Sequence, residues 1–297
     1  MKQPFISILI VTWNRKSDLA RCLDSALAQT WTNKEIVVVD NSSSDGTADM
    51  LSARFPQARL VHSDKNLGCP SGRNLGFRHC RGEYIYCLDD DGWLKPDAIE
   101  VAVRSAESDE RIGVVMSRLH IVAEGAVVLK VPKGAESPVY QASFCGGCSL
   151  IRRAVIERAG GFPEDFVRQA EEDDLAIRIL DAGYFCFLEP ASVMFHAPSA
   201  VGRNERAFAF YTLRNTNRTG LRHWSFPWCA LRPLLNLGHA LRYMVTQRYA
   251  ALPWMVLGHL VIDLVNLSGR RRPVSFRTNR LFLDLCRQPS ASRPAGP

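Results

Sequence analysis

The sequence predicts an α/β protein with a doubly wound sheet, and two buried runs separated by a helix carry this prediction. Phe5–Val11 and Glu35–Val39 are continuous β-branched runs, which is the pattern of strands buried on both faces of a parallel sheet. Between them, Lys16–Gln29 places its apolar residues at helical spacing. A strand, a helix and a second strand in this order predict a βαβ unit.

The same alternation continues along the chain. A turn-forming, helix-capping cluster at Asp40–Thr47 precedes a helix over Ala48–Arg54. A short strand at Leu60–His62, a helix that opens within Gly68–Gly76 and a strand at Tyr84–Leu88 follow. Further along, we expect an edge strand and three helices, over Val127–Val131, Asp97–Ser105, Arg152–Ala159 and Asp173–Ala182.

Size and composition exclude a disordered or fibrous protein. With 297 residues, 46% of them hydrophobic, the chain can form one large α/β domain, or a domain of about 200 residues with an appendage. We expect Phe5–Val11 to be a strand rather than a signal peptide, because no small-residue cleavage site follows it. Nine cysteines at irregular spacing indicate reduced thiols, and we interpret Cys145 and Cys148 as incidental buried thiols rather than a zinc site.

Charge divides the chain into two parts. Residues 201–297 hold 15 Lys and Arg against three acidic residues, a net charge of +12, so the first 200 residues carry −5 of the total +7. The basic part interleaves arginines with long apolar runs instead of clustering them on one short helix. We therefore expect this part to meet an anionic membrane surface and not nucleic acid.

Polar residues follow three of the predicted strands directly. These are Thr12–Arg15, Asp40–Asn41 and Asp89–Asp91. Ligands of doubly wound sheets bind outside the carboxyl ends of the strands, so these residues are expected to converge on one crevice.

The acidic triplet Asp89–Asp91 has the spacing of a divalent-cation site. Asp89 and Asp91 can share Mg²⁺ or Mn²⁺ that neutralises a diphosphate, while Asp90 points aside or reaches a sugar or ribose. The alternative is a solvated acidic turn. The preceding apolar run Tyr84–Leu88 favours the cation site. Carboxylates that crowd together beside a buried strand repel one another, and a bound cation reduces this repulsion.

The chain resembles the family 2 glycosyltransferases, which have the GT-A nucleotide-diphospho-sugar fold, a doubly wound mixed sheet. The resemblance rests on six stretches that occur in the family's order between about residues 5 and 200. They are SILIVTWNR (7–15), VVVDNSSSDGT (37–47), NLGCPSGRNLGF (66–77), YIYCLDDDGWLKPD (84–97), GGFPEDF (160–166) and EEDDLAIRILDAG (171–183).

On the donor side, the resemblance implies that Thr12 and Asn14 line the nucleotide pocket and that Asp40 receives a pyrimidine base. A carboxylate only accepts hydrogen bonds, so it selects a donor edge such as an imide N–H. An Asx turn with Ser43 or Ser44 is the alternative for Asp40. Further donor-binding residues are expected from the same motifs, namely Arg15, Asn41, Arg73, Asn74, Asp89 and Asp90.

On the acceptor side, the resemblance assigns the catalytic base to Glu172. The four consecutive acids 171–174 blur the register, so Glu171 and Asp173 remain alternatives, and Asp174 is expected to pair with Arg178 at i+4. Some of these acids also complement the helix macrodipole. His196 stands where relatives often have a histidine. It is expected to be a third metal ligand or to contact the diphosphate, and a structural role is the alternative.

The sequence of residues 208–288 predicts helices that lie at a membrane surface. Phe208–Arg218 resembles a Tyr-x-x-Arg-Asn element of bacterial members that act on lipid-linked glycans. Trp224–Leu241 and Ala250–Leu267 are long apolar stretches, and Pro253, His259 and Asp263 interrupt the second, which favours an interfacial or re-entrant hairpin over a span. Arg270–Arg272 would then lie against anionic lipid, and packing on the catalytic body or on a dimer partner is the alternative.

The expected organisation is therefore a GT-A catalytic domain over 1–207, with a nucleotide-binding half at about 1–95 and an acceptor half at about 96–207. A helical membrane-associating region at 208–288 and a disordered tail at 289–297 complete it.

The expected function is inverting transfer of a sugar from a UDP- or dTDP-sugar to a glycan acceptor, lipid-linked, in cell-surface polysaccharide synthesis. The chain resembles rhamnosyl-, galactosyl- and N-acetylglucosaminyl-type transferases of bacteria. We expect the protein to attach peripherally to the inner face of the cell membrane, and the sequence leaves a homodimer open. A polyprenyl-phosphate glycosyltransferase and a non-catalytic membrane-anchored nucleotide-sugar-binding subunit are the alternatives. A nucleotidyltransferase would need a Gly-rich, Arg-containing phosphate loop after the first strand, where this chain has Thr12–Arg15.

Overall fold

The computed structural model describes residues 3–123, 126–129, 136–198, 204–247, 249–267 and 271–296. The strands are β1 (Ile6–Thr12), β2 (Lys34–Asp40), β3 (Ala58–His62), β4 (Tyr84–Asp89), β5 (Gly92–Leu94), β6 (Ile112–Ala123), β7 (Ala126–Leu129), β8 (Val139–Gln141), β9 (Cys148–Arg152) and β10 (Phe185–His196). The helices are α1 (Lys16–Leu27), α2 (Thr47–Arg54), α3 (Gly68–His79), α4 (Ala98–Ser108), α5 (Arg153–Ala159), α6 (Glu171–Asp181), α7 (Glu205–His223), α8 (Trp228–Thr246), α9 (Leu252–Leu267) and α10 (Phe276–Arg287).

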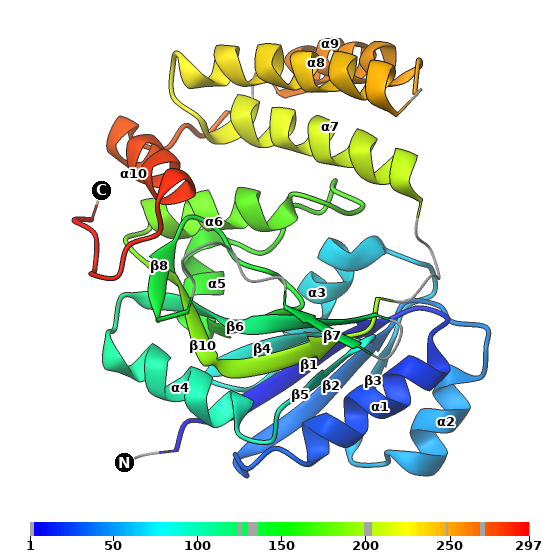
Figure 1. The fold of residues 1–297 in the computed structure, drawn as a ribbon. Coiled ribbons are helices and arrows are strands. Elements are labelled where there is room, and N and C mark those ends of the chain that lie inside the picture. Colours follow the sequence, from blue (N-terminus) through cyan, green and yellow to red (C-terminus); the bar gives the residue numbers. More distant parts are fainter. Residues whose placement is uncertain are drawn as a thin grey trace.

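One mixed sheet forms the centre of the described chain, with its main strands in the order β3-β2-β1-β4-β9-β6-β10-β5. Helices α1, α2 and α4 cover one face, and α3, α5 and α6 cover the other (Figure 1). β7 pairs with β6 and β8 pairs with β10, off this path. The predicted α/β mixed sheet is confirmed.

The parallel half of the sheet follows from its apolar runs. β1 pairs in parallel with β2 on one side and β4 on the other, and every residue of β1 except Val11 is buried. β-branched residues fill such two-sided positions because the pleated surface packs them well. The register places Thr12 beside Asp40 and Val11 beside Asp89, so the polar ends of the three strands meet at one edge.

The second half of the sheet contains strands that the sequence pattern did not reveal. β9 pairs antiparallel with both β4 and β6, and β10 runs parallel to β6 with register shifts between Glu189 and Val193. Polar residues lie inside these strands, among them Ser117 of β6 and Ser192 of β10. Their hydroxyl groups form a hydrogen bond with 2.6 Å between the two oxygens. They interrupt the apolar runs by which a strand is recognised. The expected edge strand at Val127–Val131 corresponds to β7, and residues 130 and 131 lie outside the described residues.

The helical region forms a further layer, with α7 next to α6 and with α8 and α9 beyond α7 (Figure 1). α7, α8 and α9 share a small core of six residues, Ala209, Phe210, Leu213, Ala240, Leu252 and Val256. The predicted boundary at 207/208 falls in the first turn of α7, which begins at Glu205.

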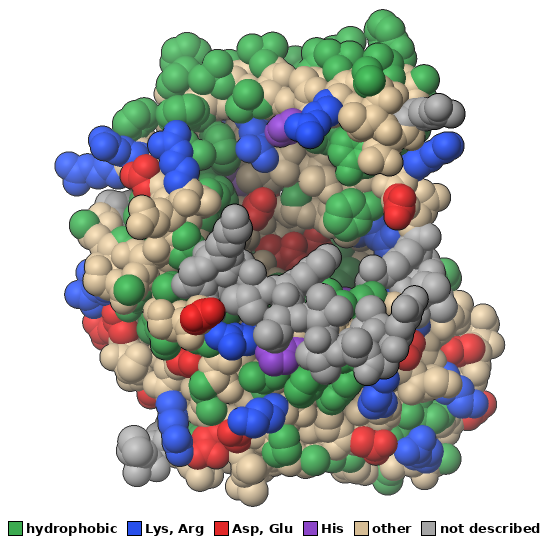
Figure 2. All heavy atoms as spheres, viewed as in Figure 1, with side chains coloured by type: hydrophobic (Ala, Val, Ile, Leu, Met, Phe, Trp, Pro, Cys, Tyr) green, Lys and Arg blue, Asp and Glu red, His purple; other side chains and the backbone are tan. Residues whose placement is uncertain are grey.

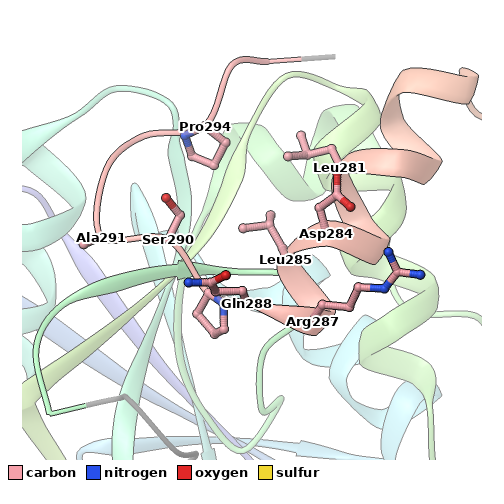
Figure 3. Close-up of a pocket in the computed structure, with 9 residues that line it drawn as sticks. Leu281, Asp284, Leu285, Arg287, Gln288, Ser290, Ala291 and Pro294 are labelled. Atoms are coloured by element: carbon pink, nitrogen blue, oxygen red, sulfur yellow. The ribbon is translucent and has the colours of Figure 1, made fainter.

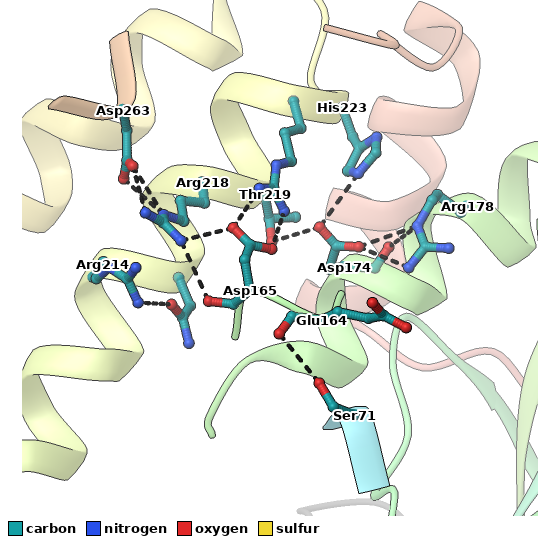
Figure 4. A network of polar contacts seen from close by, with 12 residues as sticks. Ser71, Glu164, Asp165, Asp174, Arg178, Arg214, Arg218, Thr219, His223 and Asp263 are labelled. Atoms are coloured by element: carbon teal, nitrogen blue, oxygen red, sulfur yellow. Dashed lines mark hydrogen bonds and ion pairs between the residues drawn. The ribbon is translucent and has the colours of Figure 1, made fainter. Parts of the chain in front are cut away.

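Asp263, an acid inside an apolar stretch of the sequence, is buried in α9 with an exposed fraction of 2%. Arg218 of α7 donates from its Nε to both carboxylate oxygens at 2.9 Å (Figure 4). Arg218 also pairs with Asp165 at 2.7 Å, on the loop before α6. A buried charge persists only when it is paired in this way, so the acid ties α9 through α7 to the sheet domain.

The structure contradicts the expectation of a disordered C-terminal tail. Residues 289–297 were expected to be disordered, whereas within 289–296 the backbone of Ser290 exchanges hydrogen bonds of 2.9 and 2.7 Å with Tyr140 of β8. Arg293 also pairs with Asp109 at 3.2 Å. These contacts come from distant parts of the chain, which composition cannot reveal. Among the residues that the structure describes, no helix is both long enough and apolar enough to cross a bilayer, and Arg270 lies outside those residues.

Candidate active site

The acidic triplet turns away from the sheet where β4 ends. Asp90 and Asp91 have exposed fractions of 4% and 2%, and β5 then pairs with the end of β10 so that Gly92 lies opposite His196. His196 Nε2 lies 2.8 Å from Asp91 Oδ1. Single ligand atoms of Asp89, Asp91 and His196 all lie within 4.8 Å of one another. The structure thus brings together the three residues expected to bind metal.

These three residues fit a divalent cation of the Mg²⁺ or Mn²⁺ type. Two carboxylate oxygens are hard ligands, and one imidazole nitrogen is compatible with Mn²⁺. Burial lowers the pKa of His196, but the hydrogen bond and charge of Asp91 outweigh this effect and raise it. The acidic side chains gather in a hollow between the sheet and the helical region (Figure 2).

Arg15, which is expected among the donor-binding residues, lies against the triplet. Its Nη1 is 2.7 Å from Asp90 Oδ1 and 3.2 Å from Asp91 Oδ2. Burial raises the pKa of Asp90 to about 6, and the neighbouring guanidinium opposes that shift. Arg15 therefore offsets part of the negative charge that collects at the end of β4.

Arg73 joins the triplet to the acids of α6. Its side chain extends from α3 into the interior of the protein and has an exposed fraction of 4%. Its Nη2 donates to Asp89 Oδ1 at 2.9 Å, and its Nη1 lies 3.8 Å from Glu171 Oε1 and 3.9 Å from Glu172 Oε1. The buried Arg73 guanidinium therefore contacts carboxylates from both β4 and α6.

Glu172 is held at the edge of this group. Its Oε1 accepts a hydrogen bond of 3.1 Å from the backbone N–H of Gly146. Burial and the neighbouring Glu171 raise the pKa of Glu172 well above its usual value, although Arg73 acts in the opposite direction. Asp174 is different, because it pairs with Arg178 at 2.7 Å as predicted. Burial raises its pKa, but the hydrogen bond with His223 and the charge of Arg178 outweigh this effect and lower it to about 2.

The loop that contains Cys145 and Cys148 supplies two glycines that the sequence reasoning missed. A Cβ on Gly147 would lie 2.0 Å from Asp89 Oδ2, and a Cβ on Gly146 would lie 2.4 Å from Arg73 Nη1. Only glycine lets this backbone approach the charged side chains so closely. The Gly-Gly pair was the available signal. Both cysteines are free of disulfides, with Cys148 buried and Cys145 partly buried.

Residues of the expected nucleotide pocket line the ends of β1 and β2. Asn14 has a left-handed φ of 52°, and its Oδ1 accepts from Ser44 N–H at 2.8 Å. Asp40 is buried at 1% exposure and accepts from Ser43 N–H at 3.0 Å, so the Asx turn considered for it is present. Its other oxygen, Oδ2, lies 3.6 Å from His62 Nδ1. Thr12 is buried beside Asp40 at the strand end.

Two further predicted donor residues bond to the backbone. Asn74 donates to Phe162 O and accepts from Phe162 N–H, both at 2.8 Å, so its amide joins α3 to the loop before α6. The structure thus does not bring Asn74 to the carboxylates. The reason is that Asn74 follows Arg73 on a helix and points to another side of it. Asn41 Nδ2 similarly donates to Gly68 O at 3.1 Å, at the start of α3.

A separate pocket lies far from these residues along the chain. It is lined by α10 and the following segment, including Leu281, Asp284, Gln288 and Pro294 (Figure 3). None of the predicted site residues contributes to it. The acidic group at the end of β4 is therefore the candidate active site.

A family model described as Glycosyl transferase family 2 matches residues 7–160, slightly more than half of the chain. The chain belongs to glycosyl transferase family 2. The resemblance drawn from the sequence motifs is therefore confirmed. Among curated relatives, chondroitin synthase of Escherichia coli is 31% identical over 192 residues, which cover 61% of this chain and 27% of that protein. The chain spans less than two thirds of the length of the first curated relatives it matches.

Solved structures share the fold. Mannosyltransferase PcManGT from Pyrobaculum calidifontis, in complex with GDP-Man and Mn²⁺, superposes with a TM-score of 0.61 at 22% identity, covering 96% of this chain and 80% of that one. GalNAc-T7 with UDP, GalNAc and Mn²⁺ gives a TM-score of 0.64 at 15% identity, covering 90% of this chain and 57% of that one. The expected GT-A-like mixed sheet with a C-terminal helical region is confirmed.

Gly147→Ala tests whether Asp89 must pack on a bare backbone. The added Cβ would displace the carboxylate, so we expect the affinity for Mn²⁺ to fall by about 10-fold or more, as for other changes that move a metal ligand. Isothermal titration with Mn²⁺ measures this. Gly238→Ala in α8, where nothing lies within 4 Å of the new Cβ, is the control and should bind as the wild type does. Equal affinity in both variants would contradict the assignment.

Proposed function

We propose that this protein transfers a sugar from a nucleotide-diphospho-sugar to a glycan acceptor, with a divalent cation bound by Asp89, Asp91 and His196. The observation that carries the proposal is the convergence of these three ligands at the end of β4 in a family 2 chain. The Mn²⁺ present in both solved neighbours supports it. When bound, Mg²⁺ or Mn²⁺ supplies positive charge to a diphosphate leaving group.

We assign the nucleotide to the ends of β1 and β2. Thr12, Asn14 and Asn41 would line its pocket, and Asp40 would accept a hydrogen bond from the imide N–H of a uracil or thymine base, which favours a UDP- or dTDP-sugar. Its Oδ1 already holds the turn at Ser43, so Oδ2 is the oxygen for the base. Arg15 and Asp90 would face the diphosphate and ribose, and the ion pair with Arg73 would orient Asp89.

We assign the acceptor to the side of Glu172. Direct displacement at an anomeric carbon inverts its configuration and needs a base beside the acceptor hydroxyl. Glu172 has a raised pKa, which makes it a stronger base, and the hydrogen bond from Gly146 N–H fixes its orientation. Glu171 is more deeply buried, at 5% exposure. Burial also raises the pKa of Asp173, but the polar neighbours that act on this acid are Ser143 and Arg232 and not Arg73. Both are therefore weaker candidates for the base.

We further propose that residues 1–207 act as the catalytic unit and that residues 208–288 attach it to the cytoplasmic face of a membrane, where the acceptor is lipid-linked. The outward residues of α8 and α9 are apolar and exposed, among them Leu234 at 65%, Trp254 at 73% and Val265 at 72%. Hydrophobic side chains dominate the edge of the molecule where these helices lie (Figure 2). Exposed arginines of the same region supply the charge that attracts anionic lipid, including Arg242, Arg271, Arg272, Arg277 and Arg280.

Glu172→Gln tests the base. We expect kcat for transfer to fall by about 10²-fold or more while the donor KM changes little, because the amide cannot accept the proton. The donor is the UDP- or dTDP-sugar that the wild type turns over best in a panel. Since the pKa of Glu172 is raised, wild-type kcat should increase with pH through a value above the usual glutamate range, and the variant should lose this limb.

The matched control is Glu157→Gln, an exposed glutamate of α5, which should keep wild-type kcat. Full activity of Glu172→Gln would instead favour a polyprenyl-phosphate acceptor, whose phosphate needs no base. A chain that turns over no donor in the panel would favour the binding-subunit alternative.

Trp254→Ser combined with Val265→Ser tests the membrane surface. Both side chains are largely exposed, so folding should persist while sedimentation with phosphatidylglycerol vesicles decreases several-fold, as expected when buried apolar area is lost. Leu60→Ser, an exposed apolar residue of β3, is the control and should leave sedimentation unchanged. Binding to vesicles that is indifferent to the double variant would argue against this surface.

A further inference from the structure

The acidic helix α6 begins after an unusual turn. Gln169 and Ala170, the two residues before Glu171, have left-handed φ values of 70° and 61°. Such conformations are uncommon for residues other than glycine, and alanine has no polar side chain that could stabilise them locally. Ala170 is the N-cap residue of α6, and it provides no side-chain hydrogen bond to the helix. The surrounding structure must therefore hold this turn.

Asn215 of α7 makes the contacts that hold it. Its Nδ2 donates two hydrogen bonds of 2.8 Å, one to Arg168 O and one to Gln169 O. These carbonyls belong to the peptide planes on either side of the Gln169 Cα, so their orientation defines φ and ψ of that residue. The Asn215 side chain is completely buried. Both amide protons are thus used on the two planes that define the turn.

The turn determines where the catalytic acids of α6 lie. Glu171 and Glu172 are its first two helical residues, and both lie within 4 Å of Arg73 Nη1. A change in φ or ψ at Gln169 or Ala170 would rotate the first turn of α6 and move Glu172 Oε1 from Gly146 N–H. The same face of α7 contacts α6 again, where Thr219 Oγ1 and His223 Nε2 each lie 3.3 Å from Asp174 Oδ2 (Figure 4).

α7 is itself fixed from its other side. Asn236 of α8 donates from Nδ2 to Thr216 Oγ1 at 2.8 Å and to Asn217 Oδ1 at 2.7 Å. Asn215 thus hydrogen-bonds the turn before α6, while Asn217, two residues later and also buried, hydrogen-bonds α8. This difference provides a control of the same residue type on the same helix.

We propose that Asn215 is a positioning residue for Glu172, which it places by holding the left-handed turn at Gln169 and Ala170. The inference rests on the proposed function, in which Glu172 is the base. It gives a role to the Tyr-x-x-Arg-Asn element, which lies in α7 as Tyr211, Arg214 and Asn215. The helical region then contributes to catalysis through α6 as well as to attachment.

The test compares Asn215→Ala, Asn215→Asp and the control Asn217→Ala. With the donor that the wild type turns over, we expect kcat of both Asn215 variants to fall by about 10- to 100-fold, as misplacement of a catalytic group does, with donor KM within about 3-fold of wild type. Asn215→Asp keeps the shape but turns an oxygen toward two carbonyl oxygens, so it should be no better than Asn215→Ala. Asn217→Ala should keep wild-type kcat.

Hydrogen exchange of the backbone amide of Asp174, which donates to Ala170 O across the first turn of α6, provides a measurement without substrate. We expect exchange there to be faster in both Asn215 variants and unchanged in Asn217→Ala. Wild-type kcat in Asn215→Ala, an equal loss in Asn217→Ala, or recovery in Asn215→Asp would each overturn the inference. If the wild type turns over no donor, the proposed function fails, and the exchange result alone decides whether Asn215 holds the turn.

Discussion

The arrangement of the site depends on one buried cation, the Arg73 guanidinium. It lies between Asp89 at the end of β4 and the first turn of α6, and it is nearly inaccessible to solvent. Without it, the carboxylates of two separate elements would face each other in a poorly solvated space, where like charges repel strongly. Gly146 and Gly147 complete this arrangement, because any side chain at either position would occupy the space of Arg73 or Asp89. β4, α3, β9 and α6 must therefore be assembled together before the site exists.

The helical region belongs to the same arrangement. Arg218 bridges Asp263 of α9 and Asp165 of the loop before α6, and Asn215 and His223 of the same helix contact the turn before α6 and Asp174 within it. A buried ion pair that lost one member would leave an uncompensated charge, so these contacts constrain how α7 sits on the sheet domain. The helical region and the acids of α6 are therefore held in one packed arrangement.

The sequence predicts the parallel half of the fold and most of the acidic site well, because both have strong local signals. Apolar runs mark β1, β2 and β4, and these strands end at Thr12, Asp40 and Asp89. β6, β9 and β10 were not recognised, since their pairing is long-range and buried serines interrupt their apolar patterns. The roles of Gly147, Asn74 and Asn215 could not be predicted, because each depends on contact with a residue distant in sequence. The buried partner of Asp263 was unpredictable for the same reason.

The central claim is that Asp89, Asp91 and His196 bind a divalent cation that holds a nucleotide diphosphate. Thermal unfolding with UDP and with dTDP, each with Mn²⁺ or with EDTA, tests it most directly, because a ligand of the folded state at about 100 times its Kd adds about 2.7 kcal/mol of apparent stability. The account predicts that at least one of the two nucleotides raises Tm with Mn²⁺, that EDTA removes the increase, and that Asp91→Asn does not show it. An equal increase in EDTA, or no increase with either nucleotide, would contradict the account.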